Sequence, residues 1–352
     1  MIGKPGNYFF LLPVLAFLPW WGMLIAMLAC WAGQGHPVYA FMDPAQHTVY
    51  ISDVGATNLN PLFISCAGWQ GLFYVLTIAC EFFQRSGYWP FKLRSNYRTA
   101  ADEGHEDDPT YDSMKNEYST MCMSSRFLMP PWYSVHERNL IFASFALGLI
   151  GELGILFCSI FTTAKYPHVH TAMVSIFVAF MLLSIVCNIA EYFSMGKHYA
   201  LLHPLAAQNQ VEGLEKITYG DLKWYQWKGH VWNKFTLSGL AKMAWLFWAI
   251  IFAICFGAIA NNSTSAVFEW LLAFWFGVWY IILAVDFYVG SRYKKSRYFH
   301  QIRSFAGYYK YDRENGSTQF SHIVDPVDDE LMVGDLDSRH YMQYTPSEEY
   351  SR

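Results

Sequence analysis

The sequence predicts an all-α polytopic membrane protein, a bundle of six transmembrane helices with both termini in the cytosol. Six apolar stretches alternate with polar segments, and each is about 20 residues or longer, enough to cross a ~30 Å hydrocarbon layer. Lys and Arg fall almost entirely on alternate connections, and this bias sets the orientation by the positive-inside rule. Composition agrees, since 54% of residues are hydrophobic and only 15% are charged.

The predicted spans follow one another along the chain with one long outer loop, at 34–61, and two long cytosolic loops. The spans cover residues 8–33, 62–84, 140–161, 169–193, 236–260 and 266–289. The first span is not a cleaved signal peptide, because its apolar run exceeds the ~7–15 residues of such a segment. Trp20, Trp21 and Trp275 are among the aromatic residues expected at headgroup level near span ends.

Charge divides the chain into two parts. Of the 24 Lys and Arg, only Lys165 lies on a predicted outer connection, and Lys242 lies inside the fifth span. Residues 1–300 are predicted to form the six-span membrane domain. Residues 301–352 are predicted to form a cytosolic tail, largely disordered, because the segment is acidic and lacks apolar periodicity.

A basic cluster follows the sixth span, at Arg292, Lys294, Lys295 and Arg297. Anionic lipids of the inner leaflet attract each such charge by about 1 kcal/mol. The cluster therefore indicates contact with lipid headgroups. The alternative is that these residues only fix the topology.

Polar residues inside the spans form a second set of candidates. Glu152 lies near the middle of the third span among Gly148, Gly151 and Gly154, which allow a neighbouring helix to approach closely. It indicates either a headgroup or sterol pocket, or a protonated carboxyl that is hydrogen-bonded across helices.

The other polar residues lie closer to the predicted inner ends. Asn188 is a conceivable partner for Glu152. Glu81, Glu191 and Asp286 are expected to reach water there, and so are weaker indications of a site.

Several classes of function lack support in the sequence. The seven cysteines are odd in number and none lies in a predicted outer loop, which argues against a disulfide framework. His36, His47, His168 and His170 match no compact metal motif. There is no Ser–His–Asp arrangement, nucleotide fingerprint or basic surface for nucleic acid. We therefore expect a non-enzymatic protein without a metal or cofactor.

One motif carries a family resemblance. The segment Ile51-Ser52-Asp53-Val54-Gly55, with Pro61 shortly after it, resembles the first outer loop of the Frag/DRAM/Sfk membrane family. The six spans and the segment 188–192, at the end of the fourth span, also resemble this family. The long first cytosolic loop and the acidic tail are most similar to the fungal Sfk branch. Asp53 is expected to accept backbone hydrogen bonds in this loop, and Gly55 to take a positive φ.

This resemblance implies a function. It implies a plasma-membrane protein that acts with a phosphatidylinositol 4-kinase complex and supports phosphoinositide homeostasis and phospholipid asymmetry, without catalytic residues. Its expected partners are that kinase complex and anionic inner-leaflet lipids, with sterol left open. Two alternatives stay open: a glycosylphosphatidylinositol-lipid remodelling factor of the secretory pathway, and a lipid or ion carrier.

Overall fold

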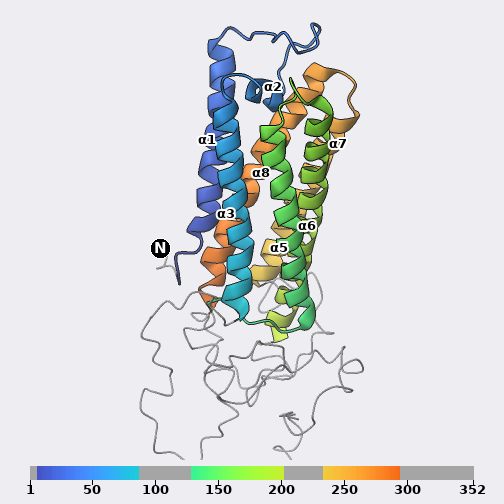
Figure 1. Ribbon diagram of the computed structural model, residues 1–352. Coiled ribbons are helices and arrows are strands. Elements are labelled where there is room, and N and C mark those ends of the chain that lie inside the picture. The colour runs from blue at the N-terminus through green and yellow to red at the C-terminus, as the bar shows by residue number, and fades with distance from the viewer. Residues whose placement is uncertain (1–5, 87–127, 202–232, 294–352) are drawn as a thin grey trace, which may run out of the picture.

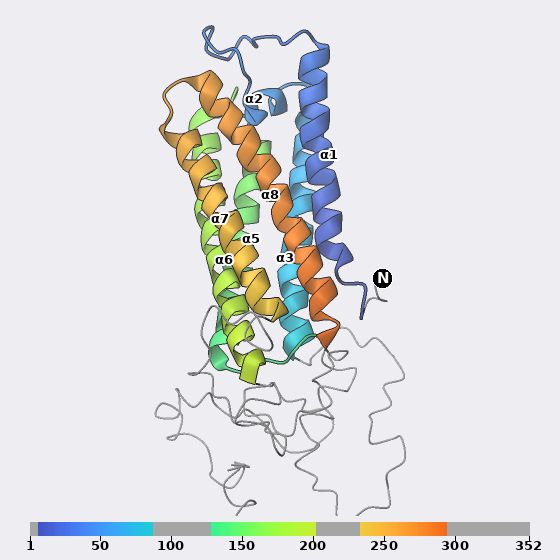
Figure 2. The ribbon, with the colours of Figure 1, turned by 180° about the vertical axis from the view of Figure 1, so that it is seen from behind.

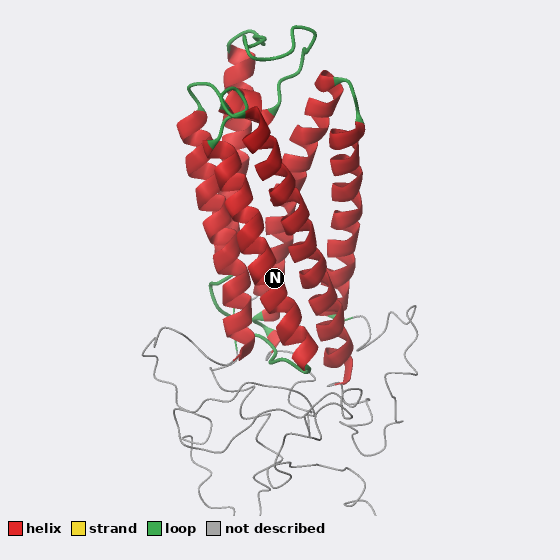
Figure 3. Ribbon diagram, turned by 45° about the vertical axis from the view of Figure 1, so that its right-hand side comes forward, coloured by secondary structure: helices red, strands yellow, loops and turns green. Residues whose placement is uncertain are grey.

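Six long helices make up the protein in a computed structural model that describes residues 6–86, 128–201 and 233–293 (Figure 1). The helices are α1 (Leu11–Gly33), α3 (Asn60–Ser86), α5 (Val135–Ile160), α6 (Pro167–Leu201), α7 (Lys234–Ala258) and α8 (Asn262–Gly290). Each is long and apolar enough to span a bilayer, so this is a multi-pass membrane protein. The described residues contain no strand, which confirms the all-α prediction (Figure 3). The 301–352 tail lies outside them.

The helices form a closed ring. Each long helix packs against its neighbours in chain order, and α8 closes the ring against α1. A short helix, α2 (Ile51–Gly55), contacts α1, α3 and α8 at one end of the bundle, called the α2 end here. The start of α1 and the end of α8 lie at the opposite end, the termini end (Figures 1 and 2).

Polar side chains define where several helices begin. The Ser134 hydroxyl accepts a hydrogen bond from the Glu137 N–H at the start of α5. Asn233 accepts from the Phe235 N–H at 3.0 Å and the Thr236 N–H at 3.2 Å at the start of α7, and Asn261 from the Thr264 N–H at 3.0 Å at the start of α8. Each cap satisfies N–H groups that have no partner within the helix.

Tryptophan side chains join the helices within the bundle. Trp20 donates its indole N–H to the Ala273 carbonyl at 2.8 Å, and Trp21 donates to the Phe274 carbonyl at 3.1 Å. Trp245 and Trp275 donate to each other's carbonyls, at 2.8 and 2.9 Å. The expectation that Trp20, Trp21 and Trp275 lie near helix ends was wrong, because backbone carbonyls of a neighbouring helix satisfy their indoles at mid-helix depth.

Helices α5 and α6 approach closely at the glycines predicted for this purpose. A Cβ added at Gly154 would lie 2.9 Å from the Phe177 amide nitrogen and 3.1 Å from the Met173 carbonyl oxygen. Only glycine leaves room for backbone at that distance. The α5–α6 pair therefore forms a tight wall of the ring.

Candidate functional site

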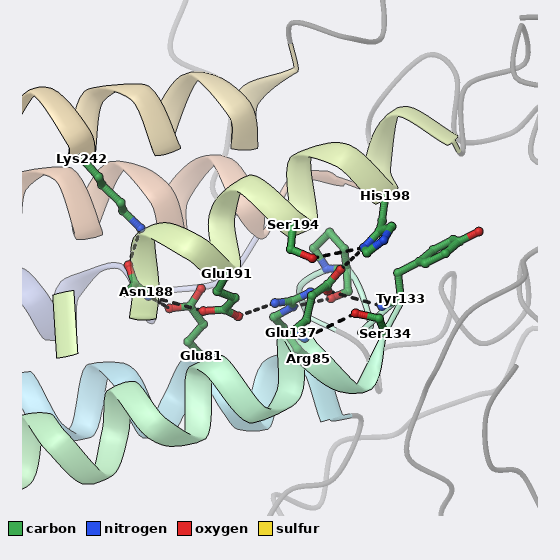
Figure 4. Close-up of polar contacts among 11 residues, drawn as sticks. Glu81, Arg85, Tyr133, Ser134, Glu137, Asn188, Glu191, Ser194, His198 and Lys242 are labelled. Carbon is green, nitrogen blue, oxygen red and sulfur yellow. Dashed lines mark hydrogen bonds and ion pairs between the residues drawn. The ribbon is translucent and has the colours of Figure 1, made fainter. Parts of the chain in front are cut away.

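The most unusual feature of the bundle is a buried ion network near the termini end, most of which Figure 4 shows. We define it as Glu81, Arg85, Glu137, Asn188, Glu191, His198, Lys242 and Asp286. These residues lie on α3, α5, α6, α7 and α8, and each is at most 6% exposed. Charge at such depth is costly unless it is paired and hydrogen-bonded, so the partners decide what the network can do.

Arg85 is the centre of one half of this network. Its guanidinium pairs with Glu137 on α5 through Nη2 and with Glu191 on α6 through Nη1. Its Nε donates to the Pro130 carbonyl at 3.0 Å. All three nitrogens of the planar guanidinium are therefore occupied, and they join α3 to α5, α6 and the segment before α5.

Glu137 also faces a histidine. Its Oε1 lies 2.5 Å from Nδ1 of His198, and the His198 ring stacks on Tyr133 with centroids 4.4 Å apart. Figure 4 shows these side chains where the described part of α6 approaches its end. Because α6 has 35 residues, about 52 Å at 1.5 Å per residue, this last part reaches beyond a ~30 Å hydrocarbon layer.

Lys242 is the centre of the other half. Its Nζ donates to Asn188 Oδ1 at 2.6 Å and lies 2.8 Å from Asp286 Oδ2, and it sits 3.0 Å from the centroid of the Tyr192 ring. Asn188 Nδ2 then contacts Glu81 at 3.4 Å and Glu191 at 3.5 Å. Through Asn188, the α7 and α8 charges connect to those of α3 and α6.

The network carries more negative than positive groups. Four carboxyl groups, of Glu81, Glu137, Glu191 and Asp286, face the two fixed cations Arg85 and Lys242, a formal charge of −2 with His198 neutral. The bonds run directly between side chains and between helices. The arrangement therefore holds five helices together.

The expectation that Glu81, Glu191 and Asp286 reach water was wrong. Glu81 and Glu191 are fully buried and Asp286 is 6% exposed, because Arg85 and Lys242 supply the countercharge that water was expected to supply.

The sequence alone did not identify Arg85, Glu137 or His198 as candidates. Each lies just outside a predicted span, since the spans ended at residues 84 and 193 and the third began at 140. A span predicted from hydropathy ends at the first charged residues, but charged residues that pair with one another can still be buried in the bundle beyond that point. A signal was present in the i, i+4 spacing of Glu81 and Arg85, which places both on one helix face.

Glu152 lies deeper, among α3, α5 and α8. Its Oε1 accepts a hydrogen bond from Gln70 Nε2 at 2.8 Å, and Gln70 also donates to the Tyr280 hydroxyl. Asn188, its conceivable partner, contacts Lys242 instead. A Cβ at Gly71 would lie 3.0 Å from Glu152 Oε2, so the carboxyl is packed against the α3 backbone. It does not line the large cavity described below.

The outer-loop motif of Ser52, Asp53, Gly55 and Pro61 forms α2 and the start of α3. Asp53 Oδ2 accepts hydrogen bonds from the Tyr50 N–H at 3.0 Å and Gln46 Nε2 at 3.1 Å. Burial raises the pKa of the Asp53 carboxyl, while these two hydrogen bonds oppose the rise. Pro61 lies in the first turn of α3, where its missing N–H leaves no gap in the helix.

Gly55 does not take the positive φ that was expected. Among the described residues, only Gly35 and His36 have positive φ values, of 81° and 58°. What requires glycine at 55 is proximity, because an added Cβ would lie 2.5 Å from Phe63 Cδ1. Asn60 Nδ2 reinforces this contact by donating to the Gly55 and Ser159 carbonyls, both at 3.0 Å.

Of the basic cluster, only Arg292 lies in the described part of the chain. Its guanidinium lies 5.4 Å from the Tyr288 ring centroid. Lys294, Lys295 and Arg297 fall outside. The described residues contain no group of three or more His, Cys, Asp or Glu side chains that could hold a metal ion.

Comparison with known proteins agrees with the family resemblance seen in the sequence. A model of the Frag1/DRAM/Sfk1/Cwh43P N-terminal domain matches residues 8–290. The chain belongs to this family. Protein SFK1 of Saccharomyces cerevisiae is 57% identical to it over 337 residues, which cover 94% of this chain and 92% of the relative.

No solved structure matches the chain. The family model ends at residue 290, the last residue of α8, so it covers the bundle and not the basic cluster or the acidic tail.

Proposed function

We propose that this protein is a non-enzymatic regulator in the plasma membrane that supports a phosphatidylinositol 4-kinase complex and, with it, phosphoinositide and phospholipid-asymmetry homeostasis. The observation that carries the proposal is the 57% identity to Protein SFK1 over nearly the whole of both chains. The role itself is the one implied by resemblance to the Sfk branch.

The geometry of the bundle supports a scaffold. The ion network joins five helices near the end where the long segments 87–127 and 202–232 and the tail leave the bundle. Fixed helix ends there would offer a constant platform to a kinase complex. Phospholipid contact by Arg292, Lys294, Lys295 and Arg297 would add to this placement.

The carrier alternative requires a polar path through the bundle. A second set of polar side chains does lie inside the bundle. The Tyr74 hydroxyl contacts Ser184 Oγ at 2.9 Å, and Ser184 donates to the Ser144 carbonyl at 2.6 Å. In the described part of the chain, however, no hydrogen bond joins this set to Glu152 or to the ion network. The scaffold proposal accounts for these contacts as helix-to-helix bonds.

The test is complementation of a yeast strain that lacks Protein SFK1. Phosphatidylinositol 4-phosphate at the plasma membrane and the exposure of phospholipids on each leaflet would be measured with this chain, with an empty vector, and with a variant Arg85→Leu. We expect the chain to restore both quantities and the variant to fail. Normal values in the deletion strain, combined with defective maturation of lipid-anchored proteins, would favour the remodelling alternative.

A further inference from the structure

A cavity of about 360 Å³ lies in the half of the bundle nearest the α2 end, away from the ion network. Helices α6, α7 and α8 provide most of its walls. Its apolar rim includes Leu182, Ile250 and Ile254, which are 37%, 40% and 61% exposed on the surface that faces lipid. The cavity is therefore open to the bilayer between α6 and α7.

The cavity is long and follows the helix axes. Its lining residues on α6 run from His170 to Ile185, a distance of about 22 Å at 1.5 Å per residue. This exceeds one leaflet's share of a ~30 Å hydrocarbon layer. A molecule held there would lie along the membrane normal.

Polar groups gather at the α2 end of the cavity. Glu269 lines it and uses Oε2 to accept the Ile51 N–H at 2.7 Å, while no contact within the described residues occupies Oε1. Ser52 lines the same end. The His170 ring, which is 6% exposed, places Nδ1 3.0 Å from the Cys158 and Phe161 carbonyls, so this nitrogen donates. Nε2 is then an acceptor, and Cys158 Sγ lies 3.6 Å from it.

These groups indicate which polar headgroup a ligand would need in order to fit this end of the cavity. A free carboxyl oxygen and a ring nitrogen accept hydrogen bonds, and a serine hydroxyl does both. No Lys or Arg is among the described residues that line the cavity, so a phosphate group buried there would have no countercharge. The fitting head is small, uncharged and able to donate, as a hydroxyl is.

The apolar part of the cavity indicates what the apolar moiety of the ligand would be. Aromatic rings form much of the inner wall, where Phe276 meets Phe177 edge to face at 5.7 Å and Trp20 at 5.9 Å. Flat rings offer broad contact area to a rigid ring system, which loses little conformational freedom on binding. An acyl chain has many rotatable bonds to order and gains less from such a wall.

We propose that this cavity binds one lipid with a single hydroxyl head and a rigid, fused-ring body, which is the chemistry of a sterol. The hydroxyl lies among Ser52, His170 and Glu269, and the rings lie against Phe177 and Phe276. In the orientation that the charge bias predicts, this half of the bundle lies in the outer leaflet. The inference does not rest on the kinase role, because it follows from the shape and chemistry of the cavity.

The test uses the full-length protein in nanodiscs of phosphatidylcholine with a photoactivatable sterol. We expect labelling at the lining residues of α6, α7 and α8, and competition by unlabelled sterol but not by diacylglycerol. Ala253→Phe fills the cavity and should reduce labelling about tenfold. Ala244→Phe changes an exposed position on the same helix that does not line the cavity, and should leave labelling unchanged.

A second variant tests the head group. Glu269→Gln keeps a carbonyl oxygen that can accept a hydrogen bond at the same place, so labelling by a hydroxyl-headed ligand should change by no more than about twofold. Competition by diacylglycerol equal to that by sterol, or labelling outside the cavity of the wild-type protein, would overturn the proposal. If Ala253→Phe does not fold, the labelled positions in the wild type still decide between these outcomes.

Discussion

Gly55 is a position where glycine is required because a neighbouring side chain leaves no room for a Cβ atom. It lies in α2 with a negative φ that any residue could adopt, but Phe63 occupies the space where a side chain would begin. The motif identified the position correctly as special. It could not show the reason, because Phe63 belongs to the next helix and its distance from Gly55 depends on how α2 folds back onto α3.

Replacing Gly55 by valine should therefore destabilise the protein by overpacking, by about 1–3 kcal/mol. The measurement is the midpoint of thermal unfolding of the purified protein in detergent, together with the fraction that reaches the cell surface. Gly22→Val is the control, because nothing lies within 4 Å of a Cβ at that position. Equal midpoints for both variants would refute the steric explanation.

Helix α7 is a second case in which contacts with other helices could not be predicted from the local sequence. It is the least buried of the long helices, and its apolar pattern predicted a span at 236–260, close to the observed Lys234–Ala258. Lys242 appeared in that pattern as an isolated charge. Its partners, Asn188 and Asp286, come from two other helices, so the pairing depended on the ring arrangement and not on local sequence.

We expect Lys242 and Asp286 to be strongly coupled. Lys242→Met and Asp286→Asn should each destabilise the bundle, by about 3–5 kcal/mol, because each removes one partner of a buried ion pair. The double variant should cost clearly less than the two single costs added together.

Thermal unfolding of the four proteins in one detergent completes this cycle. Lys165→Met, at an exposed loop position, serves as the control for loss of a charge as such. Strictly additive effects of Lys242→Met and Asp286→Asn would show that the ion pair contributes nothing in the membrane protein.

For the whole molecule, apolar length and charge bias were sufficient to predict six helices and their approximate bounds. They could not reveal the closed ring, the cavity between α6 and α7, or the ion network, since each of these depends on contacts between distant segments. Side-chain pairing also extended α5 and α6 beyond the predicted spans, to Val135 and Leu201.

Orientation remains a prediction from charge. A tag placed in the 34–61 loop should react with an impermeant reagent in intact cells, and a tag after Arg352 should react only after permeabilisation. A tag in the tight 162–168 link provides a second position on the expected outer side. The reverse pattern would place both termini outside.

The basic cluster should bind anionic lipid. Changing Arg292, Lys294, Lys295 and Arg297 to glutamine should weaken association with phosphatidylserine or phosphoinositide in nanodiscs by up to about 4 kcal/mol at low salt, and less at physiological salt. Unchanged lipid binding with the correct topology would leave the cluster as a topological anchor alone. The single variant Arg292→Gln separates the described residue from the three beyond it.

The indole bonds between helices have a consequence for how this bundle tolerates substitution. Trp20 and Trp21 donate to carbonyl oxygens at Ala273 and Phe274, and every residue type provides such an oxygen. Saturation mutagenesis should therefore find a one-sided pattern, in which few replacements are accepted at Trp21 while Phe274 accepts many apolar ones. Covariation between these two positions should be weak although they touch, so contact maps inferred from related sequences would miss this part of the α1–α8 interface.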